Sequence, residues 1–372
     1  MNCKAQPSVN KKLRVAGIVG AVIASIIIIT SPGDPIPLPE PTTTIEGTDY
    51  VEVLAINLEK PRGIAIGDER IFVTEKIGRV RVIQNDLLLD EPLATLRTAN
   101  VFDGGLLGIT THPDFSTNHY IYVYYTYEEE GNLWNKILRI TESNNKLVEA
   151  ETIFDKIPGS KFSNGGVIKF GPDEKLYVAT GTISDSSHLP QDLESLSGKI
   201  LRLNDDGSIP NDNPFANLPL FSYGHRNPQG MAWDEFGNLF VTEIGPTKND
   251  EINLIHAGQN YGWPSQECSG GNFTDAVMCY DPSIEPGGIV FYSGGKLELE
   301  GYMIMATLRA SHLFQLDINE EGLISQKSIL SGIGRIRDVI EGPDGNLYII
   351  SSNTDGKGFP DDSDDKLLRI VK

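Results

Sequence analysis

Short apolar runs of four or five residues, each ended by a polar or glycine-rich turn, dominate the chain from residue 50 onward. In one copy of the pattern, Val167–Phe170 leads through Gly171–Asp173 to Leu176–Ala179, and a longer loop then leads to Ile200–Leu203. Runs of this length bounded by Gly, Pro and Asp are typical of β-strands joined by tight turns. The plan of strand, turn, strand, loop and strand occurs six times, and the copies begin at Gly63, Gly108, Val167, Met231, Gly288 and Asp338.

Six consecutive repeats made only of strands predict an all-β fold, a six-bladed β-propeller over residues 48–372. Stacked blades bury the sheet faces that a single repeat leaves exposed. The segment Tyr50–Leu54 precedes the first copy, and we expect it to add the outer strand of the last blade and close the ring. A jelly roll or a sandwich is the rival fold, but six repeats of one plan argue against it.

An almost unbroken apolar run, Val15–Thr30, follows several basic residues near the N-terminus. As a helix it would be about 24 Å long at about 1.5 Å per residue, slightly short of a bilayer core of about 30 Å. Residues 1–30 are therefore expected to be an apolar helix that acts as a signal peptide or a membrane anchor, and the lack of a clear cleavage motif favours the anchor. We expect a Pro- and Thr-rich linker over residues 31–47, with the remaining chain outside the cytoplasm.

The chain carries 51 acidic against 31 basic residues, a formal net charge of −20. A surface this acidic repels phosphate backbones, so nucleic-acid binding is disfavoured. Of the three cysteines, Cys268 and Cys279 lie in one glycine-rich stretch, and in an exported protein they are expected to form a local disulfide. Two free thiols are the alternative.

Cationic and amide side chains occur in the turns of separate repeats. Arg335 and Arg337 alternate around one strand residue, so both guanidinium groups face the same side. Arg226 with Asn227 adds a cation from a different repeat, and Arg309 adds another. Guanidinium groups bind carboxylates and phosphates with bidentate geometry, so their convergence predicts an anionic ligand at the mouth of the central channel. Salt bridges to the acidic surface are the alternative.

Hard oxygen donors occupy the turns that follow. Asp250 and Glu251 lie between carbonyl-rich turns near Gly245 and Tyr261, and calcium prefers such ligands. Loop capping is the alternative interpretation. The six histidines show no zinc-ligand spacing, and neither a nucleophile elbow nor a phosphate-binding loop occurs.

Several long motifs, in one order from about residue 58 to 370, carry a resemblance to a known family. They are Gly104–Gly108 with His112–Phe115, Gly198–Arg202 with Asp212–Pro214, and Tyr223–Gly230 followed by Trp263–Pro264. Together they resemble the soluble quinoprotein glucose/sorbosone and aldose sugar dehydrogenases, which depend on pyrroloquinoline quinone (PQQ). The resemblance implies a six-bladed propeller that oxidises the C1 hydroxyl of an aldose to the lactone, with hydride passing to PQQ beside a calcium ion. It also implies a small sugar substrate and an external electron acceptor.

The resemblance further assigns roles to residues at matching positions. The quinone site that it implies consists of Asp103, Arg226, Asn227, Arg309, Arg335 and Arg337. The carbonyls of Gly245 and Pro246 match those that hold the calcium ion beside the quinone. Glu251 and the carbonyl of Tyr261 resemble a second, structural calcium site.

Three positions depart from the family pattern. Ser163 occupies the position of the family's catalytic base, a histidine, and a serine hydroxyl accepts a proton near neutral pH only when another base activates it. Ile244 stands where the family places a histidine or glutamine near the quinone. Asp103 replaces a longer glutamine or glutamate.

These departures leave two main functional hypotheses. The first is an exported PQQ-dependent aldose sugar dehydrogenase with an altered base, for which His188 in the loop after Gly181 is a candidate. The second is a catalytically altered propeller that binds a ligand or partner without redox turnover. A calcium-dependent hydrolase is a third possibility, which the set of arginines disfavours.

Overall fold

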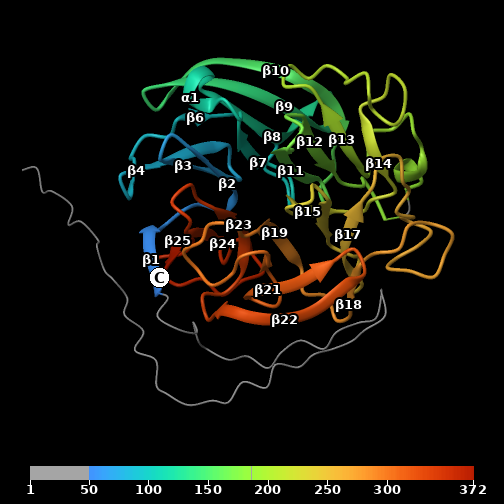
Figure 1. Ribbon diagram of the computed structural model, residues 1–372. Helices are drawn as coiled ribbons and strands as arrows, with labels where there is room; N and C mark the ends of the chain where they lie inside the picture. The colour runs from blue at the N-terminus through green and yellow to red at the C-terminus, as the bar shows by residue number, and fades with distance from the viewer. Residues whose placement is uncertain (1–49, 186) are drawn as a thin grey trace, which may run out of the picture.

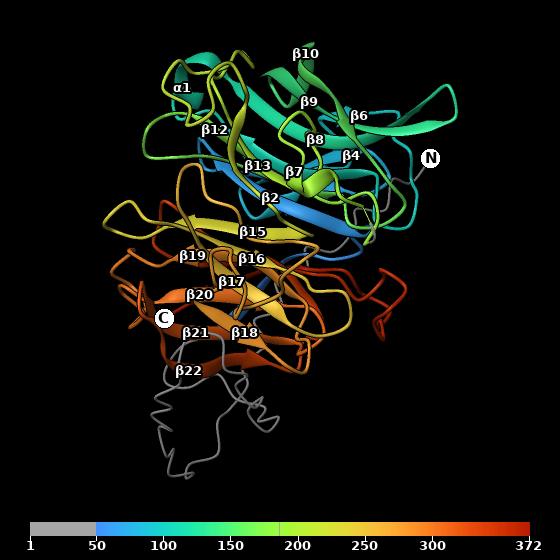
Figure 2. The same ribbon diagram turned by 90° about the vertical axis from the view of Figure 1, so that its right-hand side faces the viewer.

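Six antiparallel sheets form a closed ring in the computed structural model of the chain, which describes residues 50–185 and 187–372 (Figure 1). This confirms the all-β, six-bladed propeller. In Figure 2 the first half of the described chain, blue to green, fills one side of the ring, and the yellow-to-red half fills the other. The expected N-terminal helix (1–30) and linker (31–47) lie outside the described residues. Within the described ranges, no helix is long and apolar enough to cross a membrane.

Each blade is one sheet whose strands follow each other outward from the channel. Blade 1 contains β2 (Pro61–Gly67), β3 (Arg70–Glu75), β4 (Arg79–Gln84) and β5 (Leu87–Leu88), with β6 (Ala94–Thr95) also paired to β4. Blade 2 contains β7 (Leu106–Thr111), β8 (Tyr120–Glu129), β9 (Asn132–Ser143) and β10 (Lys146–Pro158). Blade 3 contains β11 (Gly165–Phe170), β12 (Leu176–Thr180), β13 (Lys199–Leu203) and β14 (Leu220–Tyr223).

The second half of the ring repeats this plan. Blade 4 contains β15 (Pro228–Trp233), β16 (Leu239–Glu243), β17 (Asp250–Ile255) and β18 (Met278–Tyr280). Blade 5 contains β19 (Pro286–Phe291), β20 (Met303–Thr307), β21 (His312–Asn319) and β22 (Gly322–Ser331). Blade 6 contains β23 (Ile336–Glu341), β24 (Leu347–Ser351), β25 (Leu367–Val371) and β1 (Tyr50–Ala55). Two short helices, α1 (Phe115–Asn118) and η1 (Leu189–Gln191), lie in loops.

The first and last described strands close the ring. β1 pairs antiparallel with β25, with Tyr50 opposite Val371 and Val53 opposite Leu368, as Figure 1 shows in blue and red. This confirms the expected closure by Tyr50–Leu54. This pairing covers the outer edge of β25 and ties the first and last described strands of the ring together.

The outer strands of blades 1 to 5 were not predicted, whereas that of blade 6 was. The sequence pattern predicts three strands per copy, whereas every sheet has at least four. β10 shows the reason: most of its 13 residues are exposed, so it lacks the buried alternating face that marks a strand. Its position depends on the ladder that it forms with β9.

The core lies between blades, and glycines set how closely the inner strands approach. Buried side chains of blade 2, such as Tyr124, pack with Ile168 and Val178 of blade 3 in one cluster. A Cβ on Gly108 would collide with the carbonyl of Gly166 on the next inner strand. Glycine therefore lets neighbouring blades meet backbone to backbone around the axis.

A disulfide joins Cys268, in the loop after β17, to Cys279 in β18, which confirms the expected pairing. Such a bond is typical of proteins in oxidising compartments and therefore favours an extracytoplasmic location.

Candidate functional site

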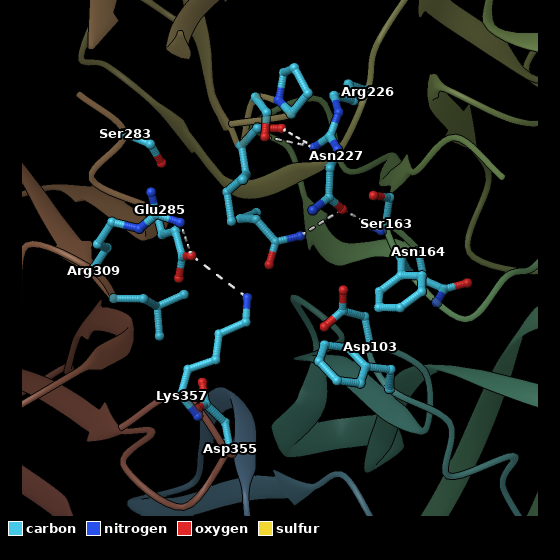
Figure 3. A pocket seen from close by; sticks show the side chains of 18 of the residues that line it. Asp103, Ser163, Asn164, Arg226, Asn227, Ser283, Glu285, Arg309, Asp355 and Lys357 are labelled. Atoms are coloured by element: carbon cyan, nitrogen blue, oxygen red, sulfur yellow. Dashed lines mark hydrogen bonds and ion pairs between the residues drawn. The ribbon is translucent and has the colours of Figure 1, made fainter. Parts of the chain in front are cut away.

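A cavity of about 660 Å³ opens at one end of the central channel, where the innermost strands begin (Figure 3). Two kinds of loop line it. Loops that enter a new blade bring in Asp103, Ser163 and Arg226, and loops between the second and third strands of a blade bring in Asp185 and Arg309. Residues far apart in sequence therefore meet on one face, as expected for binding loops held by a rigid scaffold.

Most of the candidate site residues line this cavity. They are Asp103, Ser163, Arg226, Asn227, Gly245, Pro246, Arg309, Arg335 and Arg337. Ile244, the second departure from the family pattern, lines it as well. Glu251 and Tyr261 instead line a small adjacent void, which also contacts Gly245 and Pro246. His188 is exposed next to η1 and does not line the cavity, so its proposal as the altered base is wrong.

A buried carboxylate fixes the turn that carries Arg226 and Asn227. Glu243, at the end of β16, accepts hydrogen bonds from the backbone N–H groups of both residues. Glu243 also contacts Nδ1 of His225 at 3.1 Å, while Nε2 of His225 lies 2.8 Å from the hydroxyl of Ser222. His225 is fully buried, so its role is to hold this turn.

Arg226 is itself held on several sides. Its Nε and Nη2 donate to the two carboxylate oxygens of Asp185 at 2.9 and 3.1 Å. Its Nη1 donates to the carbonyls of Ile244 and Gly245 at 2.8 and 2.9 Å. The guanidinium also lies over the ring of Trp263, 5.4 Å from its centroid. This network fixes the guanidinium at the cavity wall before any ligand binds.

Glu285 organises the opposite wall, as Figure 3 shows. Its two oxygens accept hydrogen bonds from Arg309 at 2.8 Å and Arg335 at 2.9 Å, and Lys357 lies at 3.6 Å. Burial by itself raises the pKa of Glu285, but Lys357, Arg335 and Arg309 outweigh it and lower the pKa to about 2. Glu285 therefore keeps these cations close together and stays ionised.

Glu285→Gln is expected to destabilise the fold by about 3 kcal/mol at pH 7, because it leaves the cations of a buried ion-pair network without their carboxylate. An acid whose folded pKa is lowered stabilises above its ordinary pKa of 4.5, and this contribution is lost as the pH falls towards about 2. The stability gap between wild type and variant should therefore narrow on acidification. Urea unfolding at pH 7, 4.5 and 3 measures it, and a gap that does not depend on pH would contradict this assignment.

Arg62, Gln229 and Arg337 form a set that the sequence interpretation recognised only in part. Each is the second residue of an innermost strand, β2, β15 or β23, so they occupy equivalent positions in the repeat. Arg337 donates to Oε1 of Gln229 at 3.1 Å, and its buried Nε has no hydrogen-bond partner. Burial, followed by the charge of Arg62, lowers the pKa of Arg337 to about 9. Aligning the repeats would have revealed Arg62 and Gln229.

The cavity carries an excess of positive charge. Eight cationic side chains line it, Lys60, Arg62, Lys76, Arg226, Arg309, Arg335, Arg337 and Lys357, against four carboxylates, Asp103, Asp185, Glu285 and Asp355. This excess contrasts with the acidic chain as a whole. An unpartnered buried guanidinium nitrogen in a cationic cavity fits an anionic ligand such as a quinone that carries several carboxylates.

Groups that accept protons are scarce in this cavity. No described histidine lines it. Ser163, at the position of the family's base, adopts a left-handed backbone conformation with φ of 56°. Asp185, Glu285 and Asp355 are all engaged by arginines. The carboxylate of Asp103 accepts no hydrogen bond from the described residues, and in Figure 3 it points into the cavity on the same side as Ser163.

The cavity shows little of the side-chain clustering that a metal site needs. Within residues 50–185 and 187–372, no three His, Cys, Asp or Glu side chains converge as a metal site. The carbonyl of Gly245 already accepts a hydrogen bond from Arg226. The expected calcium site at the Gly245 and Pro246 carbonyls stays a prediction.

The fold and the site define the class: a six-bladed propeller with a cationic cavity at one end of its channel. The chain belongs to the glucose/sorbosone dehydrogenase family, since the family profile described as Glucose / Sorbosone dehydrogenase matches residues 58–369. This is a family of PQQ-type aldose sugar and glucose dehydrogenases. The match confirms the resemblance and covers nearly the whole described propeller.

Individual relatives agree with this assignment. The chain is 31% identical to the aldose sugar dehydrogenase of Escherichia coli strain K12, over 83% of this chain and 92% of that protein. It is 28% identical to quinoprotein glucose dehydrogenase B of Acinetobacter calcoaceticus, over 84% and 87% of the two chains. The PQQ-bound aldose sugar dehydrogenase of Streptomyces coelicolor superposes with a TM-score of 0.79 at 33% identity, covering 89% and 99% of the two chains.

Proposed function

We propose that this protein is an exported quinoprotein that oxidises the C1 hydroxyl of an aldose to the lactone with PQQ as hydride acceptor. The observation that carries the proposal is the cationic cavity, in which Arg226 from the loop that enters blade 4 converges with Arg335 and Arg337 at the start of blade 6. Family membership supports the same chemistry, and the disulfide supports export. An external electron acceptor is the expected second substrate.

In this proposal different cavity residues bind the cofactor and the sugar. Arg226, Asn227, Arg309, Arg335 and Arg337 bind and orient the cofactor, which when bound supplies a two-electron acceptor. The C1 hydroxyl of the sugar lies towards Ser163 and Asp103. Asp103 accepts the hydroxyl proton, because it is the cavity carboxylate that no described arginine engages by a hydrogen bond or salt bridge. Ser163 donates or accepts a hydrogen bond to the sugar and does not itself act as the base.

A binding protein without redox turnover is the second candidate function. It is favoured by one observation: Ser163 replaces the family's base histidine, and no described histidine lines the cavity. Such a protein would retain the anion-binding arginines while lacking efficient proton transfer.

One experiment separates the two. The purified full-length protein is loaded with PQQ and Ca²⁺, the quinone absorbance is recorded, and aldoses are assayed with a dye acceptor. A dehydrogenase shows the quinone spectrum and sugar-dependent dye reduction. A bound quinone without dye reduction for any aldose supports the binding protein, and the absence of a quinone spectrum rejects the first proposal.

Calcium is expected to stabilise the protein through Glu251 and the carbonyl of Tyr261. Burial, and then the charge of Glu243, raise the pKa of Glu251 to about 8, so its ionised form is unfavourable in the fold without a cation. When the Ca²⁺ concentration is about 100-fold above its dissociation constant, binding adds about 2.7 kcal/mol to the free energy of unfolding. This corresponds to a rise in Tm of about 5 °C. Thermal unfolding with Ca²⁺ or a chelator measures it.

Glu251→Gln is the matched variant for this test. Without calcium it should unfold no earlier than wild type at pH 8, because it removes an acid whose raised pKa costs stability as the pH rises from 4.5 through about 8. With calcium it should show no Tm shift. An undiminished shift in this variant would place the calcium elsewhere.

A further inference from the structure

The wall of the cavity formed by blade 1 carries cations that no carboxylate neutralises directly. No described carboxylate oxygen lies within 4.0 Å of the side-chain nitrogens of Lys60, Arg62 or Lys76. The other walls differ, since Arg226 is paired with Asp185 and Arg335 with Glu285. We call Lys60, Arg62 and Lys76 the blade 1 cluster.

The chain holds this cluster together although its members repel each other. The backbone N–H of Lys76 donates to the carbonyl of Lys60 at 3.1 Å, and Nζ of Lys76 donates to the carbonyl of Phe102 at 2.5 Å. Burial and then the charges of Arg62 and Lys60 lower the pKa of Lys76 to about 8, with Asp103 opposing and Arg337 adding to the effect. A bound anion would relieve this repulsion.

An aromatic pair borders the same part of the cavity. Phe102 and Phe162 line the cavity, their ring centroids are 4.8 Å apart, and they are 58% and 53% exposed. Large aromatic side chains left this exposed at a cavity commonly mark a binding surface. Two adjacent rings offer an apolar face on which the C–H groups of a sugar ring can pack.

We propose that the blade 1 cluster and the Phe102–Phe162 pair form a substrate subsite for an anionic sugar, an aldose that carries a carboxylate or a phosphate. The inference rests on the proposed function and specifies its substrate class. The sugar ring packs on the aromatic pair, the acidic group contacts Lys60 and Lys76, and the C1 hydroxyl is left near Asp103 and Ser163. Its oxidation follows the same balance as before, with the proton to Asp103 and the hydride to the quinone.

The cluster is distinct from the residues proposed to hold the cofactor. Those residues, Arg226, Asn227, Arg309, Arg335 and Arg337, belong to blades 4 to 6 or to the loops that enter them. Lys60 and Lys76 precede and follow the first two strands of blade 1. The aromatic pair comes from the loops that enter blades 2 and 3. Arg62 is the exception, because it occupies the position in β2 that Arg337 occupies in β23 and its charge acts on Arg337.

The test measures binding before activity. Calorimetry on the full-length protein without cofactor compares the binding of glucuronate, glucose 6-phosphate and glucose. The three sugars share one ring and differ only at C6. We expect at least one anionic sugar to bind about tenfold more tightly than glucose, equivalent to about 1.4 kcal/mol. Lys76→Met should remove this preference without weakening the binding of glucose. The control is Lys136→Met, at a lysine that lies over the ring of Tyr127 in blade 2, and this variant should keep the preference for the anionic sugar.

The outcomes separate the possible sources of the anion. Preference for glucuronate assigns the subsite to a carboxylate, and preference for glucose 6-phosphate assigns it to a phosphate. Equal or tighter binding of glucose overturns the proposal. So does a loss of PQQ affinity in Lys60→Met and Lys76→Met with no change in sugar preference, because the cluster would then hold the cofactor. If anionic sugars bind preferentially but no sugar reduces the dye, the subsite stands and the dehydrogenase proposal fails.

Discussion

Asp103→Asn is expected to lower kcat for sugar oxidation about 10²–10⁴-fold, the loss that follows removal of a general base. Asparagine keeps the shape of the side chain but cannot accept the proton of the C1 hydroxyl. The other cavity carboxylates are engaged by arginines, so none is free to replace Asp103. Steady-state dye reduction gives kcat and KM, and the quinone absorbance reports cofactor binding, which should change little.

A histidine at position 163 provides the complementary test. Ser163 has φ of 56°, a left-handed conformation in which histidine is enriched relative to most residues. Adding Ser163→His to the Asp103→Asn variant should therefore raise its kcat at least about tenfold, which is part of what a general base contributes. Asp90→Asn, an exposed aspartate in blade 1 outside the cavity, is the matched control. If the Asp103→Asn variant kept the wild-type kcat, Asp103 would not be the general base.

Arg226→Ala is expected to weaken PQQ binding about 100-fold, about 2.7 kcal/mol, within the range for removing one partner of a buried charge interaction. The variant loses the cation that faces the ligand and also leaves Asp185 and the carbonyls of Ile244 and Gly245 without their donor. Titration of the apoprotein with PQQ, followed by quinone absorbance, measures the change.

The control for Arg226→Ala is an arginine with similar contacts outside the cavity. Arg139 pairs with Glu151 and lies over the ring of Tyr120 on blade 2. Arg139→Ala should keep full PQQ affinity. Circular dichroism checks that both variants fold, and unchanged affinity in a folded Arg226→Ala protein would show that the quinone does not bind at this wall.

Much of the fold could be predicted because its signals are local. Each inner strand combines an apolar run with a Gly, Pro or Asp turn, and six copies of that pattern define the blades. The outer strands of blades 1 to 5 were missed: β10 is exposed and polar at most positions, and β14 and β18 have only four and three residues. They become strands through pairing with the preceding strand, which no local pattern encodes.

The candidate site was predictable where the repeat itself carries the residue. Arg226 and Arg337 were found because charged groups interrupt otherwise apolar repeats, and both line the cavity. Glu285 was missed because nothing near it in sequence indicates that it meets arginines 24 and 50 residues away. His188 was a wrong candidate for the opposite reason: proximity in sequence to a cavity loop did not bring it into the cavity.

The sequence alone determined the propeller, the closing strand, the disulfide and the family, because these depend on short repeated patterns and on motifs in a fixed order. The tertiary structure decided which charges are paired and which remain open to a ligand. Ring closure brings loops from all six repeats to one cavity. There Glu285 pairs with Arg309 and Arg335, whereas the side chains of the blade 1 cluster and of Asp103 form no salt bridge with a described residue. Pairing between such distant residues is set by the geometry of the ring and not by their spacing along the chain.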